Sequence, residues 1–73
     1  MKFQLTELEQ QLLEDQSILF DPHQDYTLDE ALELLEQVRD IEVMYAQDYE
    51  NSQETLYYLY GNLADKIHAQ IPE

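Results

Sequence analysis

The chain has 73 residues, 44% of them hydrophobic, and 17 Asp and Glu against three Lys and Arg give a formal net charge of −14. A chain this short has room for one hydrophobic core, so residues 1–73 are predicted to form a single domain. Leu, Ile, Val and Phe account for 20 of the 73 residues, or about 27%. This fraction is above the roughly 20% below which a highly charged chain stays disordered. The absence of Cys excludes disulfides and thiolate zinc sites, and it fits a reducing compartment.

The negative charge restricts the classes of partner. Binding to a nucleic acid backbone draws its affinity from Lys and Arg, so direct nucleic acid binding is not expected, and anionic membranes are disfavoured for the same reason. No apolar run approaches the roughly 18 residues of a membrane span, and the first residues do not resemble a signal peptide. We therefore expect a cytoplasmic protein whose partner is a protein with a basic surface.

Three N-cap motifs divide the chain into predicted helices. In each motif a Thr or Asn side chain can accept from a free backbone N–H, and a Glu three residues later can reach back. The pairs are Thr6 with Glu9, Thr27 with Glu30, and Asn51 with Glu54. Gly and Pro occur only at Pro22, Gly61 and Pro72, and this scarcity favours long helices.

The first helix is predicted over residues 7–19, and its apolar side is Leu5, Leu8, Leu12 and Leu19. It must end before Pro22, whose ring disfavours helix at the preceding residue. Residues 20–26 then form a connection of ordinary length, in which Phe20 and Tyr26 can cover the end of the core.

The second and third helices are predicted over residues 28–49 and 52–70. In the second helix, the inward side follows steps of three and four at Leu28, Ala31, Leu35, Val38, Ile41 or Glu42, and Tyr45, and it is flanked by Leu32, Leu34 and Tyr49. In the third helix the same spacing is found at Leu56, Leu59 or Tyr60, Leu63 and Ile67.

Two points leave alternatives open. Neither Gly nor Pro separates Tyr49 from Ser52, so the two helices could form one continuous rod that buries its apolar side against a second chain. Gly61 and Asn62 could end one helix and begin another, although a helix that runs through Gly61 and packs closely there is favoured. We predict an all-α, three-helix bundle in up-down-up order. The alternative is a helical hairpin or a long helix completed by dimerisation.

The main candidate binding surface is a row of carboxylates on the second helix. Steps of four, three and four place Asp29, Glu33, Glu36 and Asp40 on one face. Such a row resembles the regular charges of a nucleic acid strand, so a protein groove shaped for phosphates could accept it. A solvated face is the simpler interpretation, but a face that serves stability alone would normally intersperse Lys and Arg. Glu30, Glu42, Asp48 and Glu50 extend the negative field.

Five tyrosines cluster between residues 45 and 60, and packing in or beside the core explains most of them. Tyr58 is the exception, because it projects about 100° from Tyr57 and lies off the apolar side of the third helix. We predict that Tyr58 is an exposed aromatic contact for a partner.

Neither a metal site nor a catalytic site is predicted. Residues 21–25 place Asp21, His23 and Asp25 at alternate positions, as in the calcium loop of an EF-hand. The sixth position of that loop needs Gly and the twelfth needs Glu, but this sequence has Tyr26 and Leu32 there. Acid–base catalysis needs carboxylates in a water-poor cleft, and there is no Cys or Gly-rich phosphate loop to support other chemistry. We expect no cofactor and no enzyme activity.

Two functions remain. In the first, the carboxylate row binds a basic site on a partner protein, as in an inhibitor, an antitoxin-like or immunity-like factor, or a nucleic acid mimic. Asp29, Glu33, Glu36 and Asp40 supply the charge and Tyr58 is a candidate anchor. In the second, the chain is a structural or adaptor subunit that forms a homodimer or packs against a partner helix, and the acidic face serves solubility.

Overall fold

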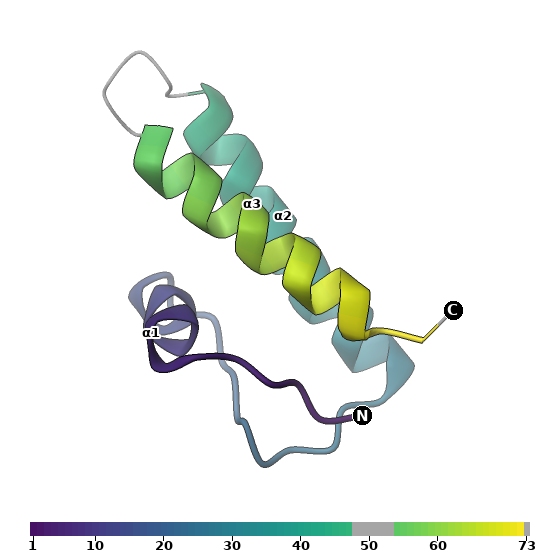
Figure 1. Cartoon of the computed structure of the whole chain (residues 1–73). Coiled ribbons are helices and arrows are strands. Elements are labelled where there is room, and N and C mark those ends of the chain that lie inside the picture. Colours follow the sequence, from purple (N-terminus) through teal and green to yellow (C-terminus); the bar gives the residue numbers. More distant parts are fainter. Residues whose placement is uncertain (48–53, 73) are drawn as a thin grey trace.

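The computed structural model describes residues 1–47 and 54–72, and within these ranges it contains three α-helices and no strands. The helices are α1 (Glu7–Asp15), α2 (Leu28–Gln47) and α3 (Glu54–Gln70). Figure 1 shows α2 and α3 side by side as an antiparallel hairpin, with the shorter α1 on one side of it. The predicted all-α three-helix bundle is confirmed. The predicted end of the second helix at Tyr49 and start of the third at Ser52 lie outside the described residues.

The first two predicted N-caps are formed. The Thr6 side chain accepts from the backbone N–H of Glu9, and the backbone N–H of Thr6 donates to the Glu9 carboxylate at 2.8 Å. Thr27 and Glu30 make the same reciprocal pair, with the Thr27 N–H donating to Glu30 Oε1 at 3.0 Å. These bonds satisfy N–H groups that have no partner inside a helix, so α1 and α2 begin where the sequence places them. Asn51, the predicted cap of the third pair, lies outside the described residues, so the outcome of that prediction is not described.

The first helix is shorter than predicted, because it ends at Asp15 instead of residue 19. Ser17 adopts a left-handed conformation with φ of 58°, and the N–H groups of Ser17 and Ile18 donate back to the carbonyls of Glu14 and Leu13. This is the Schellman arrangement, which normally uses Gly at the left-handed position. It turns the chain so that Ile18 and Leu13 are both buried, and the hydrophobic contact between these two positions accompanies such an ending.

Because α1 ends early, the prediction of which of its leucines are buried is wrong in part. Leu12 is buried and Leu5 packs at the edge of the core, but Leu8 is exposed and Leu19 keeps 93% of its surface exposed. Figure 1 shows α1 almost end-on in the view that displays α2 and α3 lengthwise, so α1 lies across the hairpin and not alongside it as up-down-up order would require. A short helix that crosses the hairpin buries fewer of its leucines than a long helix packed in parallel.

The packing of α2 against α3 excludes the continuous rod. Helix α3 runs unbroken through Gly61, as the favoured interpretation required. A Cβ atom at Gly61 would lie 2.6 Å from Oε2 of Glu42 on α2, so a side chain there would have to displace the Glu42 carboxylate.

The core lies where both long helices meet α1. Its fully buried members on the hairpin are Ala31, Val38, Tyr60, Leu63, Ala64 and Ile67. Leu35, Ile41, Tyr45, Leu56 and Leu59 pack partly buried against it, as their spacing predicted. Leu28 was predicted on the apolar side of this helix and Leu32 beside it, yet both are exposed, whereas Leu34, also predicted beside the apolar side, is buried.

Aromatic side chains close one end of the core. The ring of Tyr26 lies 5.5 Å from the ring of Phe3 in an edge contact and 5.9 Å from the ring of Phe20 in a stacked one. The Tyr26 hydroxyl accepts from the N–H of Asp21 at 3.0 Å, and the N–H of Tyr26 donates to the carbonyl of Met1. Tyr26 and Phe20 therefore cover the end of the core as predicted.

Within residues 1–47 and 54–72, no helix combines the length and the apolar character that crossing a membrane requires.

Candidate protein-binding surface

The four carboxylates of the predicted row are all exposed on α2. The buried side of this helix is Ala31, Leu34 and Val38. At 100° per residue, the row projects from the side of α2 opposite to these three residues. This carboxylate row consists of Asp29, Glu33, Glu36 and Asp40. It spans about 16 Å along the helix at 1.5 Å per residue.

The residues expected to extend the negative field contribute unequally. Glu30 is exposed at the first turn of α2, and its bonds from the backbone and side chain of Thr27 lower its pKa below the ordinary 4.5. Glu42 is only partly exposed and is bonded to Arg39, so it adds little to the field outside the protein. Asp48 and Glu50 lie outside the described residues.

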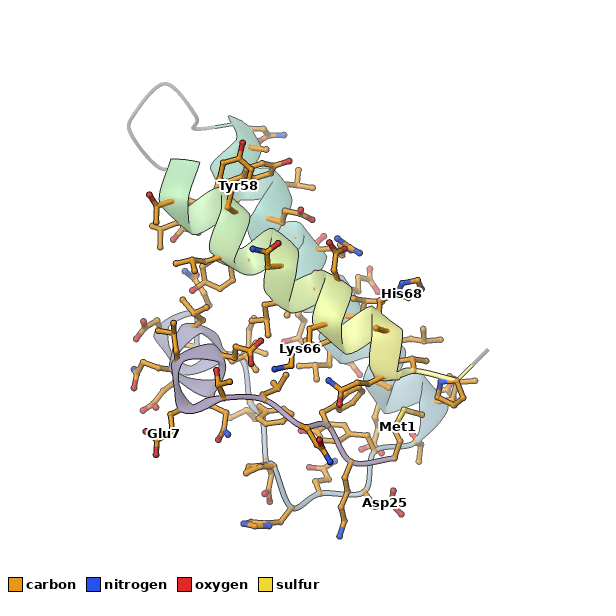
Figure 2. The ribbon with its side chains drawn as sticks, viewed as in Figure 1. Met1, Glu7, Asp25, Tyr58, Lys66 and His68 are labelled. Atoms are coloured by element: carbon orange, nitrogen blue, oxygen red, sulfur yellow. The ribbon has the colours of Figure 1, made fainter. Side chains whose placement is uncertain are left out.

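Two of the three Lys and Arg side chains fasten helices together. Arg39 bonds to Glu42 on its own helix at 3.1 Å and to Asp65 on α3 at 3.0 Å, and these bonds raise its pKa. Lys66 on α3 bonds to Glu9 on α1 at 2.6 Å. Figure 2 shows the Lys66 side chain reaching into the space between α3 and α1. Both cationic side chains therefore form ion pairs within the protein.

The carboxylate row has no such partners. None of its four side chains forms an ion pair with another of the described residues. The third Lys or Arg side chain, Lys2, is exposed near the N-terminus and also forms no ion pair with a described residue. The outer face of α2 consequently carries negative charge that the rest of the described protein does not neutralise.

Tyr58 is exposed as predicted, with 55% of its surface accessible, and its ring lies 5.3 Å from that of Tyr57. It is not beside the carboxylate row, however. The two helices are antiparallel, and the stacking of Tyr45 on Tyr60 at 5.6 Å shows which levels of them meet. Tyr58, two residues before Tyr60, thus lies level with the C-terminal end of α2, about 10 Å along the axis from Asp40 at the near end of the row and about 21 Å from Glu33. Figure 2 shows Tyr58 at the end of α3 far from His68.

The structure adds one feature that the sequence did not predict, a groove between α2 and the connection that precedes it. The groove has a volume of about 470 Å³, and its apolar lining comes from Leu19, Phe20, Tyr26 and Leu34. Asp21, Glu30 and Glu33 supply carboxylates around it. Glu33 therefore belongs both to the carboxylate row and to this groove. The sequence offers one signal, the apolar pair Leu19 and Phe20 just before Pro22, but the predicted helix over residues 7–19 places Leu19 on its apolar side.

The loop carboxylates that suggested a metal site are engaged locally. Oδ1 of Asp21 accepts from the N–H of His23 at 2.8 Å, and Asp25 bonds to the amino group of Met1. In the part of the chain that the structure describes, no three His, Cys, Asp or Glu side chains gather in a way that could hold a metal ion.

Comparisons of the chain with protein families, with curated proteins and with solved structures found no match. The candidate surface therefore stands on its own geometry and charge.

Proposed function

We propose that this protein is a non-enzymatic binding module that uses the carboxylate row of α2 to occupy a basic site on a partner protein. The observation that supports the proposal most directly is the contrast between the inside and the outside of the fold. Arg39 and Lys66 are paired between helices, whereas the row is exposed and unpaired among the described residues. Such a surface attracts basic sites and accelerates the encounter with them.

The spacing of the row favours a partner site that otherwise receives a polyanion. Steps of three and four residues separate the carboxylates by about 4.5–6 Å along the helix, and one nucleic acid strand carries a phosphate about every 3.4 Å. Both are regular lines of negative charge on a rigid support. A protein that occupies such a site blocks it, and this is how an inhibitor, an antitoxin-like or immunity-like factor, or a nucleic acid mimic acts. The lack of Cys supports a cytoplasmic setting.

The test is capture of the partner at low salt with matched charge reversals. Glu33→Lys combined with Glu36→Lys reverses the middle of the row, and Glu7→Lys combined with Glu14→Lys makes the same change of net charge at exposed positions on α1. We expect the α2 double variant to lose capture and the α1 double variant to keep most of it. Circular dichroism checks that both variants remain helical. The complex of the parent protein should dissociate steeply as salt is raised, because the contact is electrostatic.

Two results would contradict the proposal. If capture survives in the α2 double variant and is indifferent to salt, the row is not the binding surface. If the two double variants lose capture equally, only the net charge matters. Once the partner is purified, competition by a nucleic acid duplex decides between mimicry and the other kinds of inhibition.

A structural or adaptor role remains the second candidate, and exposed apolar residues on α2 favour it. Leu28, Leu32 and Val43 keep about half of their surface exposed. If copies of the chain associate through them, the melting temperature rises with protein concentration. A monomer by light scattering at high micromolar concentration, with a constant melting temperature, would exclude self-association. Packing against a different partner would still be compatible with that result.

A further inference from the structure

The groove beside α2 combines an apolar lining with carboxylates around it. Leu34 from α2 and the rings of Phe20 and Tyr26 contribute apolar surface, and Glu30 and Glu33 contribute charge. The groove is open to solvent, and its volume of about 470 Å³ leaves room for a long side chain. Leu19 stands at its edge with 93% of its surface exposed, and it also lines a second hollow of about 250 Å³.

The carboxylates of the groove are suited to hold a cation. Both oxygens of the exposed Glu30 carboxylate accept hydrogen bonds from neighbouring residues, one from the N–H of Thr27 at 3.0 Å and the other from the side-chain amide of Gln24 at 3.2 Å. A carboxylate has about four lone-pair sites, so Glu30 can still accept further bonds without losing these two. Glu33, one turn away, accepts no hydrogen bond from the described residues. The groove thus offers one fixed and one unoccupied acceptor.

We propose that this groove receives an arginine side chain from the partner, next to an apolar residue of the partner that packs on Leu19. Charge complementarity determines the choice of occupant. The guanidinium is planar, pairs with carboxylates through several donors and stacks on aromatic rings, whereas the ammonium of lysine is a compact point charge. The methylene groups of the arginine lie along Phe20 and Leu34. A second copy of this chain is a poor occupant, because its single arginine, Arg39, is already paired within the fold.

This inference rests on the proposed function, and it adds a prediction that long-range charge does not make. Glu33 and Glu36 belong to the same row and carry the same charge, but only Glu33 lines the groove. Changing either to Gln removes one charge and keeps the size of the side chain. If the groove holds the arginine, Glu33→Gln costs much more affinity than Glu36→Gln.

The experiment uses the full chain and a short fluorescent peptide in which arginine and leucine alternate, with binding followed by anisotropy at moderate salt. We expect Glu33→Gln to weaken binding roughly tenfold or more, the value of one hydrogen bond between charged groups, and Glu36→Gln to weaken it only about twofold. Peptides of the same length and charge that replace arginine by lysine, or leucine by serine, are expected to bind more weakly to the parent protein.

The apolar contact has its own matched pair. Leu19→Gln and Leu8→Gln both change exposed leucines, and only Leu19 lines the groove. The fold is expected to survive both changes, because surface substitutions of this kind usually alter stability by less than about 0.5 kcal/mol. We expect Leu19→Gln to weaken binding of the arginine–leucine peptide severalfold and Leu8→Gln to leave it unchanged.

The outcomes separate the two proposals. Equal losses for Glu33→Gln and Glu36→Gln, or equal binding of the arginine and lysine peptides, would overturn the groove and leave the carboxylate row standing. Backbone amide shifts in an NMR titration of the peptide should centre on residues 19–37, and shifts centred on Val43 and Tyr58 would overturn the groove as well. If the charge reversals at Glu33 and Glu36 leave capture of the natural partner unchanged, the proposed function itself fails.

Discussion

The hydroxyl of Tyr60 offers the most direct test of how α1 is held to the hairpin. It donates to the carbonyl of Leu12 at 2.8 Å in a buried setting. Leu12 lies in the last turn of α1, where helix carbonyls lose their usual partners, and the N–H of Gln16 donates to Leu13 and not to Leu12. One side-chain bond therefore satisfies the end of α1 and joins α3 to it.

Tyr60→Phe removes this bond and preserves the ring, including its stacking on Tyr45. A buried carbonyl left without a donor costs about 1–3 kcal/mol. Domains are stable by roughly 0.05–0.15 kcal/mol per residue, so this chain has about 4–11 kcal/mol in total. A loss of about 2 kcal/mol is then a large fraction, and it lowers the melting temperature by roughly 8–16 °C in a domain of this size.

The assay is thermal or urea denaturation followed by circular dichroism. Tyr58→Phe is the matched control, because its hydroxyl is on an exposed ring, and we expect it to change the free energy of unfolding by less than about 0.5 kcal/mol. If Tyr60→Phe is as stable as Tyr58→Phe, the bond to Leu12 contributes nothing and α1 is held by packing alone.

An alkaline titration gives a second measurement of the same group. Burial raises the pKa of Tyr60 above the ordinary 10.0, so the unfolded chain releases this proton before the folded one does. The stability that depends on the protonated hydroxyl is present below pH 10.0 and is lost as the pH rises through the folded value. Tyr60→Phe should lack this part of the alkaline loss, and an unchanged slope would contradict the assignment.

Three further predictions concern the ends of α1, its ion pair and the net charge. Ser17→Gly removes the cost of the left-handed conformation and is expected to stabilise the protein by about 1 kcal/mol in denaturation, whereas Ser17→Ala, which keeps a Cβ, gains nothing comparable. Partial burial raises the pKa of Glu9, but the bonds from Lys66 and Thr6 together bring this pKa below the ordinary 4.5. The ionised Glu9 therefore contributes stability that is present above pH 4.5 and is lost as the pH falls through the pKa of the folded state. Glu9→Gln should therefore cost up to about 1 kcal/mol at neutral pH and nothing at low pH, and a difference that persists in acid would contradict the ion pair. Because the net charge is −14, like charges repel one another across the folded protein. The melting temperature should therefore rise as salt shortens the screening length from about 30 Å at 0.01 M to about 10 Å at 0.1 M. A fall would mean that the loss of the internal ion pairs outweighs the relief of this repulsion.

The sequence predicted those parts of the fold that depend on local chemistry. The Thr6 and Thr27 caps are formed because a side-chain oxygen and a Glu three residues later satisfy N–H groups wherever a helix starts. The exposure of the carboxylate row follows from the same local rule, since positions at steps of three and four share one face whatever packs on the other.

The parts that depend on tertiary packing were not predictable in this way. Ser17 ends α1, although neither Gly nor Asn marks the position, because burial of Leu13 and Ile18 compensates for the left-handed backbone. The groove depends on that early end. Only when the chain leaves α1 at residue 16 does the connection carry Leu19 and Phe20 out toward α2.

The carboxylate row links the stability of the fold to its proposed function. Asp29 and Glu33, and likewise Glu36 and Asp40, are like charges at i,i+4, and each pair destabilises α2 by a few tenths of a kcal/mol. The fold tolerates this because the core and the bonds of Arg39 and Lys66 lie elsewhere. A basic partner would neutralise the row and remove the repulsion, so the same charges that weaken the free protein would strengthen the complex. The partner should accordingly raise the melting temperature by more for the parent protein than for a variant with Glu36→Gln.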